Sequence, residues 1–143
     1  MLKILKQNYQ KKMQNSINEK LNFAFFGTPD IASETLEILK ENGYIPSLVV
    51  TSPDKRQKRK MLITPPPVKV WAIVNNIPYV QPETNQEILS IFSNEEFRLT
   101  VHGEKKSEKA KYDLFIIVAY GKIIPENILN MPKLGSINIH YSL

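Results

Sequence analysis

The sequence predicts an α/β protein with a doubly wound, mainly parallel sheet. From Asn22 onward, short apolar runs alternate with segments of helical period, which is typical of repeated strand–helix units. Residues 113–119 (DLFIIVA) form an apolar run without alternation. Such a run indicates a strand that helices cover on both faces, as in a parallel sheet.

Each element has its own signal in the chain. Strands are expected where apolar or β-branched residues run together between turn residues, at 22–27, 44–51, 77–80, 113–119 and 135–140. Helices are expected where apolar residues recur three or four positions apart, at 31–40, 66–76, 85–92 and 125–129.

The first of these helices should begin at the cluster Thr28-Pro29-Asp30 and end at Asn42-Gly43. The side chains expected on its buried face are Ile31, Thr35, Ile38 and Leu39. In the second helix, Trp71 has helical spacing with Val74 and is expected in the core.

Two segments lie outside this alternating pattern. Residues 1–21 place Leu2, Leu5, Tyr9, Met13 and Ile17 three or four apart, which predicts a basic amphipathic extension ahead of the main domain. The segment lacks the features of a secretory signal. Residues 93–112 are polar and are expected to form a surface insertion.

Composition excludes several classes of protein. The chain has 143 residues and no cysteine, so disulfides, thiolate metal sites and cysteine nucleophiles are all excluded. No apolar run approaches the roughly 18–20 residues that span a bilayer. The net charge of +5 is concentrated in two segments: residues 1–21 hold five Lys and one Glu, and residues 51–70 hold six basic residues and one Asp.

The last predicted strand carries the candidate catalytic pair. In Ser136-Ile137-Asn138-Ile139-His140 polar and apolar residues alternate, so Asn138 and His140 should project from one side of the strand. An amide donor beside an imidazole suits a developing oxyanion, because the amide donates a fixed hydrogen bond and the imidazole can also move a proton. The alternative is a capped strand end with an ordinary histidine.

Basic residues gather in a loop at the predicted ligand-binding edge of the sheet, where the carboxyl ends of the strands lie. They are Lys55, Arg56, Lys58, Arg59 and Lys60. Such a loop can hold a phosphate backbone without distinguishing its sequence. The alternative is a solvated charged stretch. The turns at Gly27-Thr28-Pro29 and Tyr120-Gly121 also lie at this edge, but no dinucleotide or P-loop glycine motif is present.

Six segments in order resemble the methionyl-tRNA formyltransferase family. They are Phe25–Ala32, Val49–Lys55, Pro66–Lys69, Gln81-Pro82, Val118–Ile123 and Gly135–Leu143. The resemblance covers residues 22–143 and implies a Rossmann-like fold, the first part of that family's catalytic domain.

The resemblance implies transfer of a formyl group from 10-formyltetrahydrofolate to the α-amino group of methionyl initiator tRNA, without a metal. It places the catalytic residues at Asn138 and His140, and folate-binding residues at Ser142, Leu143 and Gly121. The basic loop within residues 53–69 would meet the tRNA. It further implies a protein of the bacterial cytoplasm that is a monomer when intact. The basic segment 1–21 leaves an organelle as the alternative location.

The sequence also departs from the family pattern. Lys58 and Lys60 flank Arg59 where the family usually has glycines, so the loop should be stiffer and more basic. The chain ends inside a family motif, so we expect an incomplete catalytic domain, truncated at its C-terminal side and inactive alone. Two alternatives are another 10-formyltetrahydrofolate-dependent formyltransferase or hydrolase, and a non-catalytic RNA-binding half-domain.

Overall fold

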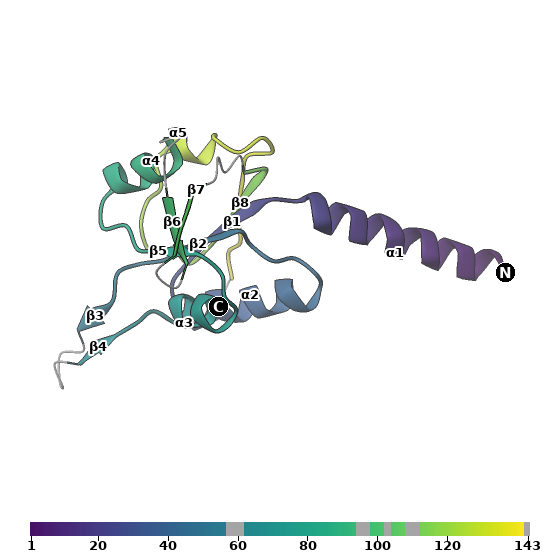
Figure 1. Ribbon diagram of the computed structural model, residues 1–143, viewed down its shortest axis with the longest axis horizontal. Helices are drawn as coiled ribbons and strands as arrows, with labels where there is room; N and C mark the ends of the chain where they lie inside the picture. The colour runs from purple at the N-terminus through teal and green to yellow at the C-terminus, as the bar shows by residue number, and fades with distance from the viewer. Residues whose placement is uncertain (57–61, 94–97, 102–103, 108–111, 142–143) are drawn as a thin grey trace.

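A five-stranded parallel sheet forms the centre of the computed structural model (Figure 1), which describes residues 1–56, 62–93, 98–101, 104–107 and 112–141. Its strand order is β5-β2-β1-β8-β9, and every neighbouring pair is parallel. The strands are β1 (Phe23–Gly27), β2 (Leu48–Val50), β5 (Tyr79–Val80), β8 (Leu114–Val118) and β9 (Ser136–Asn138). The predicted α/β class with a parallel sheet is confirmed.

Helices cover both faces of this sheet (Figure 1). On one face, α2 (Asp30–Glu41) and α3 (Pro67–Val74) bury Leu36 and Trp71 against the strands. On the other face, α4 (Asn85–Ser93) and α5 (Glu126–Leu129) bury Ile88 and Ile128. The sheet is therefore doubly wound, as predicted.

Strand β1 lies at the middle of the sheet, and all five of its residues are buried. Phe23 and Phe25 point to the α2–α3 side, whereas Phe26 points to the α4–α5 side. Phe26 packs there against Phe115 of β8, with ring centroids 5.1 Å apart. The aromatic contacts and the parallel register together make β1 the rigid centre of the sheet.

The buried face of α2 differs from the prediction. Thr35 is buried as expected, but Ile38 is 56% exposed, and the buried neighbours of Thr35 are Ala32 and Leu36. The side chain of Ala32 lies beside Gly27 at the end of β1, and Ala32 and Leu36 face the sheet on this side of the helix. Trp71 is buried as predicted, and its indole nitrogen donates a hydrogen bond to Glu37 at 2.8 Å.

Two antiparallel hairpins were not predicted. One pairs β3 (Lys55–Arg56) with β4 (Ile63–Thr64), and the other pairs β6 (Arg98–Val101) with β7 (Glu104–Ser107). These segments were expected to form a basic loop and a polar surface insertion, because charged residues outnumber the short apolar stretches within them. The β3–β4 hairpin, called here the basic arm, projects from the body beside α3 (Figure 1).

Helix α1 (Leu2–Lys20) extends away from the sheet (Figure 1). The predicted helix is confirmed, but Leu2, Leu5, Tyr9 and Met13 are all exposed, so its apolar side covers nothing in the described part of the chain. No helix within the described residues combines the length and the apolar character needed to cross a membrane.

Candidate active site

The carboxyl ends of the five parallel strands meet at one edge of the sheet. Ligands of doubly wound proteins bind at this edge. Thr28, Thr51, Gln81 and Ala119 directly follow β1, β2, β5 and β8, and Asn138 ends β9. The candidate site is therefore built from loops that are far apart in the sequence.

Thr28 joins three of these loops. Its hydroxyl donates a hydrogen bond to the main-chain oxygen of Tyr120 at 2.9 Å and lies 3.0 Å from the hydroxyl of Ser52. Ser52 in turn lies 3.3 Å from the same Tyr120 oxygen and is buried. The loops after β1, β2 and β8 are thereby fixed to one another.

Gly27 allows the loops to approach this closely. A Cβ atom on this residue would lie 2.7 Å from the Cβ of Ala32 and 2.8 Å from the main-chain oxygen of Val118. Both distances are far below van der Waals contact, and the second involves backbone. Only glycine fits at the end of β1 without displacing α2 or β8.

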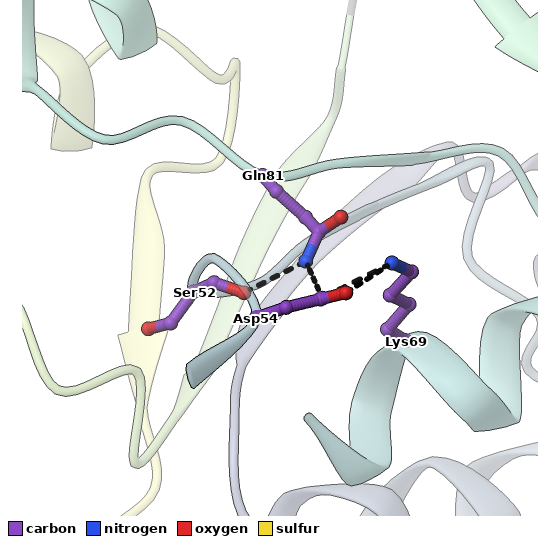
Figure 2. A network of polar contacts seen from close by, with 4 residues as sticks. All are labelled: Ser52, Asp54, Lys69 and Gln81. Atoms are coloured by element: carbon purple, nitrogen blue, oxygen red, sulfur yellow. Dashed lines mark hydrogen bonds and ion pairs between the residues drawn. The ribbon is translucent and has the colours of Figure 1, made fainter. Parts of the chain in front are cut away.

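A second polar network joins the loop after β2, the first turn of α3 and the loop after β5 (Figure 2). Lys69 donates to both carboxylate oxygens of Asp54 at 3.0 Å. The side-chain amide of Gln81 donates to Asp54 at 2.6 Å and to the main-chain oxygen of Ser52 at 3.1 Å. The hydrogen bonds from Gln81 and Lys69 hold the pKa of Asp54 below its ordinary value.

The loop after β8 is fixed by its lysine. The Nζ atom of Lys122 donates to the main-chain oxygens of Pro82 and Glu83, both at 3.0 Å. Ala119 and Gly121 have positive φ angles of 48° and 86°, so the chain turns sharply on either side of Tyr120. The polar head of Lys122 therefore connects the loops after β5 and β8.

Tyr120 belongs to the core beneath the site. Its side chain is 2% exposed and packs edge-on against Phe26, with centroids 5.5 Å apart. Burial raises the pKa of Tyr120 to about 12, and its hydroxyl has no hydrogen-bond partner among the described residues. Tyr120 therefore contributes its main-chain oxygen, and not its hydroxyl, to the loop network.

A cleft of about 330 Å³ opens between the β1 loop and the basic arm. Its polar lining is Thr28, Asp30, Lys55 and Thr64, and four prolines complete the wall: Pro29, Pro53, Pro66 and Pro67. Proline rings make the wall rigid, because their φ angles are fixed. The cleft thus offers a stiff, largely apolar surface with one cation at its rim.

The predicted pair, Asn138 and His140, lies at the end of β9, and both residues are exposed. Asn138 is in register with Ile117, whose side chain points to the α4–α5 face, and Ile139 packs on the opposite α2–α3 face. This alternation places Asn138 on the α4–α5 side of β9, and His140 lies two residues beyond the end of the strand. Neither residue is among those that line the 330 Å³ cleft.

The other predicted site residues fall into two groups. Gly121 is exposed at the same edge, and Lys55 and Arg56 form β3 with exposed side chains. The remaining predictions concern Lys58, Arg59, Lys60, Ser142 and Leu143, which lie outside the described residues.

The roles of several polar residues were missed from the sequence. Thr28 was considered as part of a turn and of a helix start, and Ser52, Asp54, Lys69 and Gln81 were noted as parts of the family-like segments, but none was given a role in a polar network. The sequence did contain a signal for these roles. Thr28, Ser52, Asp54 and Gln81 each follow closely after a predicted strand, at the edge where side chains from separate loops converge.

Metal ligands do not cluster in the described part of the chain. No three His, Asp or Glu side chains among those residues lie close enough together to hold a metal ion. The polar side chains at the edge instead pair with one another and with main-chain oxygens, as in the Asp54 network.

The sequence model of the formyl transferase family matches residues 20–143. The chain belongs to this family. The match covers every strand and helix of the sheet domain, and it confirms the family resemblance indicated by the six sequence segments. The matched range includes Asn138 and His140.

Curated relatives carry the name methionyl-tRNA formyltransferase. The protein of Caldicellulosiruptor saccharolyticus is 40% identical over 124 residues, which are 86% of this chain and 36% of that protein. The protein of Bacillus subtilis is 42% identical over 119 residues, which are 83% of this chain and 33% of that protein. The chain thus spans about a third of the length of these relatives.

Proposed function

We propose that this chain forms the first part of the catalytic domain of a methionyl-tRNA formyltransferase. The observation that carries the proposal is its 40–42% identity, over more than four-fifths of its length, to proteins of that name. On this proposal residues 22–143 belong to the catalytic domain, and residues 1–21 form an extension ahead of it.

The transfer reaction sets two chemical requirements. An amine attacks the formyl carbon, so negative charge develops on the formyl oxygen, and a proton must leave the attacking nitrogen. The Asn138 amide can donate a hydrogen bond to that oxygen. The His140 imidazole can take the proton from the amine and return it to the leaving nitrogen. Both side chains are exposed at the end of β9, which is consistent with contact to bound substrates.

The formyl donor that we propose is 10-formyltetrahydrofolate, which supplies an activated formyl group. Two observations are compatible with a donor beside the β8 loop. Asn138 and His140 are accessible at the neighbouring strand, and a Cβ on Gly121 would meet no heavy atom within 4 Å. Gly121, with Ser142 and Leu143, would hold the donor; the last two lie outside the described residues.

The acceptor that we propose is methionyl initiator tRNA, held by the basic arm. Lys55 and Arg56 are exposed, and no ion pair neutralises them among the described residues. Lys58, Arg59 and Lys60 would add to this charge in the segment outside the described residues. Phosphate contacts of this kind fix the position of the RNA without distinguishing its sequence.

We place the protein in the bacterial cytoplasm, as a monomer.

A formylation assay tests the proposal. The protein from the complete reading frame that contains this chain is supplied with 10-formyltetrahydrofolate and methionyl initiator tRNA. Formylmethionyl-tRNA should form, and Asn138→Ala should lower kcat by about 10²–10³-fold, as for loss of an oxyanion donor. His140→Ala should lower it by about 10²–10⁴-fold.

A matched control is Asn127→Ala, an exposed asparagine on α5, which should leave kcat unchanged. Absence of formylation by a folded wild-type protein would refute the proposed activity. Turnover of a sugar nucleotide, or hydrolysis of the donor without transfer, would instead favour a related 10-formyltetrahydrofolate enzyme. Salt-sensitive tRNA binding without turnover would favour a non-catalytic RNA-binding half-domain.

A further inference from the structure

We propose that Asp54 and Lys69 form a clasp that fixes the direction of the basic arm, and that they act as positioning residues for RNA. The inference rests on the proposed function, because it assigns the arm an RNA ligand. It concerns residues that make no proposed contact with the formyl group.

The position of the clasp in the chain is the first argument. Asp54 directly precedes β3, and Lys69 lies in the first turn of α3, shortly after β4. Asp54 and Lys69 are 15 residues apart in sequence. Their ion pair (Figure 2) therefore joins the two ends of the arm at its base. Among the described residues the arm has two paired positions, Lys55 with Thr64 and Arg56 with Ile63. An isolated two-stranded hairpin is marginally stable at best in water.

The geometry of the pair is the second argument. A single exposed ion pair contributes little. Asp54 is an exposed residue, but Lys69 contacts both oxygens of its carboxylate at 3.0 Å, and the side chains of Lys69 and Asp54 are 17% and 29% exposed. The Lys69 ammonium also lies 5.8 Å from the centre of the Tyr79 ring, which adds a cation–π contact.

The connection to the active edge is the third argument. Gln81 uses both hydrogens of its amide, one on Asp54 and the other on the main-chain oxygen of Ser52. Ser52 belongs to the Thr28 network that joins the loops after β1 and β8. The base of the arm is therefore tied through Gln81 to the loops that surround the proposed reaction site.

Two variants that change the charge in opposite directions distinguish a positioning role from a purely electrostatic one. Asp54→Asn makes the chain more positive, and Lys69→Met makes it less positive. If these residues acted on RNA only through charge, the first variant would bind RNA more tightly and the second more weakly. A clasp predicts that both variants bind more weakly, because each releases the arm.

The first experiment measures the arm without RNA. Since the chain has no cysteine, Ile63→Cys on β4 and Ile38→Cys on α2 introduce two exposed sites for spin labels. The label–label distance distribution should be narrow in the parent protein and broad in Asp54→Asn and Lys69→Met. The exchange Asp54→Lys with Lys69→Asp should narrow it again, because Gln81 can accept from the new lysine through its amide oxygen. An unchanged distribution in both single variants would overturn the clasp.

The second experiment measures KM for methionyl initiator tRNA. If release leaves the arm correctly directed for about a tenth of the time, KM rises about tenfold in both single variants, with kcat unchanged. The exchanged pair should restore KM. Opposite changes in KM for the two single variants would overturn the proposal.

Controls keep the two proposals distinguishable. Lys133→Met, on the loop before β9, and Glu41→Gln, on α2, are exposed and make matched charge changes away from the arm, so they report the electrostatic effect on KM. Thermal unfolding shows whether each variant folds. If Asp54→Asn or Lys69→Met does not fold, Gln81→Met replaces it in the spin-label experiment: it removes the amide that donates to Asp54, and the label–label distance distribution should broaden. A failed formylation assay would refute the proposed function, whereas the spin-label result would still decide the clasp.

Discussion

The hydroxyl of Thr28 donates a hydrogen bond to the main-chain oxygen of Tyr120, 92 residues later in the chain, at 2.9 Å. This bond joins the loops that follow two neighbouring strands, β1 and β8. Loops with such connections hold their side chains at fixed positions, which a site for group transfer requires.

Thr28→Val should destabilise the protein. Valine keeps the shape of threonine but leaves the Tyr120 oxygen and the buried Ser52 hydroxyl with fewer partners, at a cost of about 1–3 kcal/mol in the free energy of unfolding. Urea denaturation measures this change, and the double variant with Ser52→Ala should lose less than the sum of the single variants. Thr64→Val, at an exposed threonine, is the control and should have little effect. Equal stabilities for the Thr28 and Thr64 variants would contradict the prediction.

Gly27→Ala should destabilise the protein, although it adds only one methyl group. The new Cβ would approach the Val118 main-chain oxygen to 2.8 Å, and overpacking of this kind costs about 1–3 kcal/mol, occasionally more. Thermal unfolding checks the loss of stability.

Gly135→Ala provides the comparison. Gly135 has a φ angle of 79° and open space around its Cα, so alanine there meets backbone strain of about 1–2 kcal/mol without a clash. Lowered activity should therefore accompany Gly27→Ala but not Gly135→Ala, because only the first displaces the active edge. Full activity in a folded Gly27→Ala protein would show that the edge tolerates this displacement.

Stability should fall between pH 10 and pH 12 because of Tyr120. Burial raises the pKa of Tyr120 from 10.0 to about 12, so in this range the folded state keeps a proton that the unfolded state has released. The free energy of unfolding therefore decreases as pH rises through the range. In Tyr120→Phe this decrease should be smaller, and in Tyr9→Phe, at an exposed tyrosine, it should match the parent. Urea unfolding at several pH values measures the difference; identical slopes for all three proteins would refute it.

Lys55→Gln and Arg56→Gln should each weaken tRNA binding. Loss of one phosphate contact should reduce the slope of log K against log salt concentration by about 1. Fluorescence anisotropy with labelled initiator tRNA across a salt series measures the slope. The exposed Lys133→Gln, on the loop before β9, is the control. A slope that is the same in all variants would show that the arm does not contact phosphates.

The sequence predicted the sheet well because the sheet is built from the strongest local signals. The apolar runs of β1 and β8 have no competing interpretation, and their burial on both faces follows from their composition. The side of α2 that is buried against the sheet was less predictable, since Ile38 and Leu36 are equally apolar. The packing of α2 against the sheet buries Leu36 and leaves Ile38 56% exposed, and this packing is not apparent from the local sequence.

The candidate site was predicted only where its residues are close together in the sequence. Asn138 and His140 lie two residues apart in one predicted strand, so a period of two predicts a common side for them, although β9 itself ends at Asn138. The Asp54–Lys69–Gln81 network draws its members from three separate segments. No local pattern indicates such a contact, because the pairing depends on strand order.

The central place of β1 also has a consequence for biosynthesis. One neighbour, β2, follows closely in the chain, but the other side of β1 pairs with β8, and Asp113 lies 91 residues after its partner Asn22. At about 5–20 residues per second, a ribosome needs roughly 5–20 s to make that stretch. During this interval the apolar edge of β1 has no partner, so the nascent chain should depend on chaperones until β8 emerges.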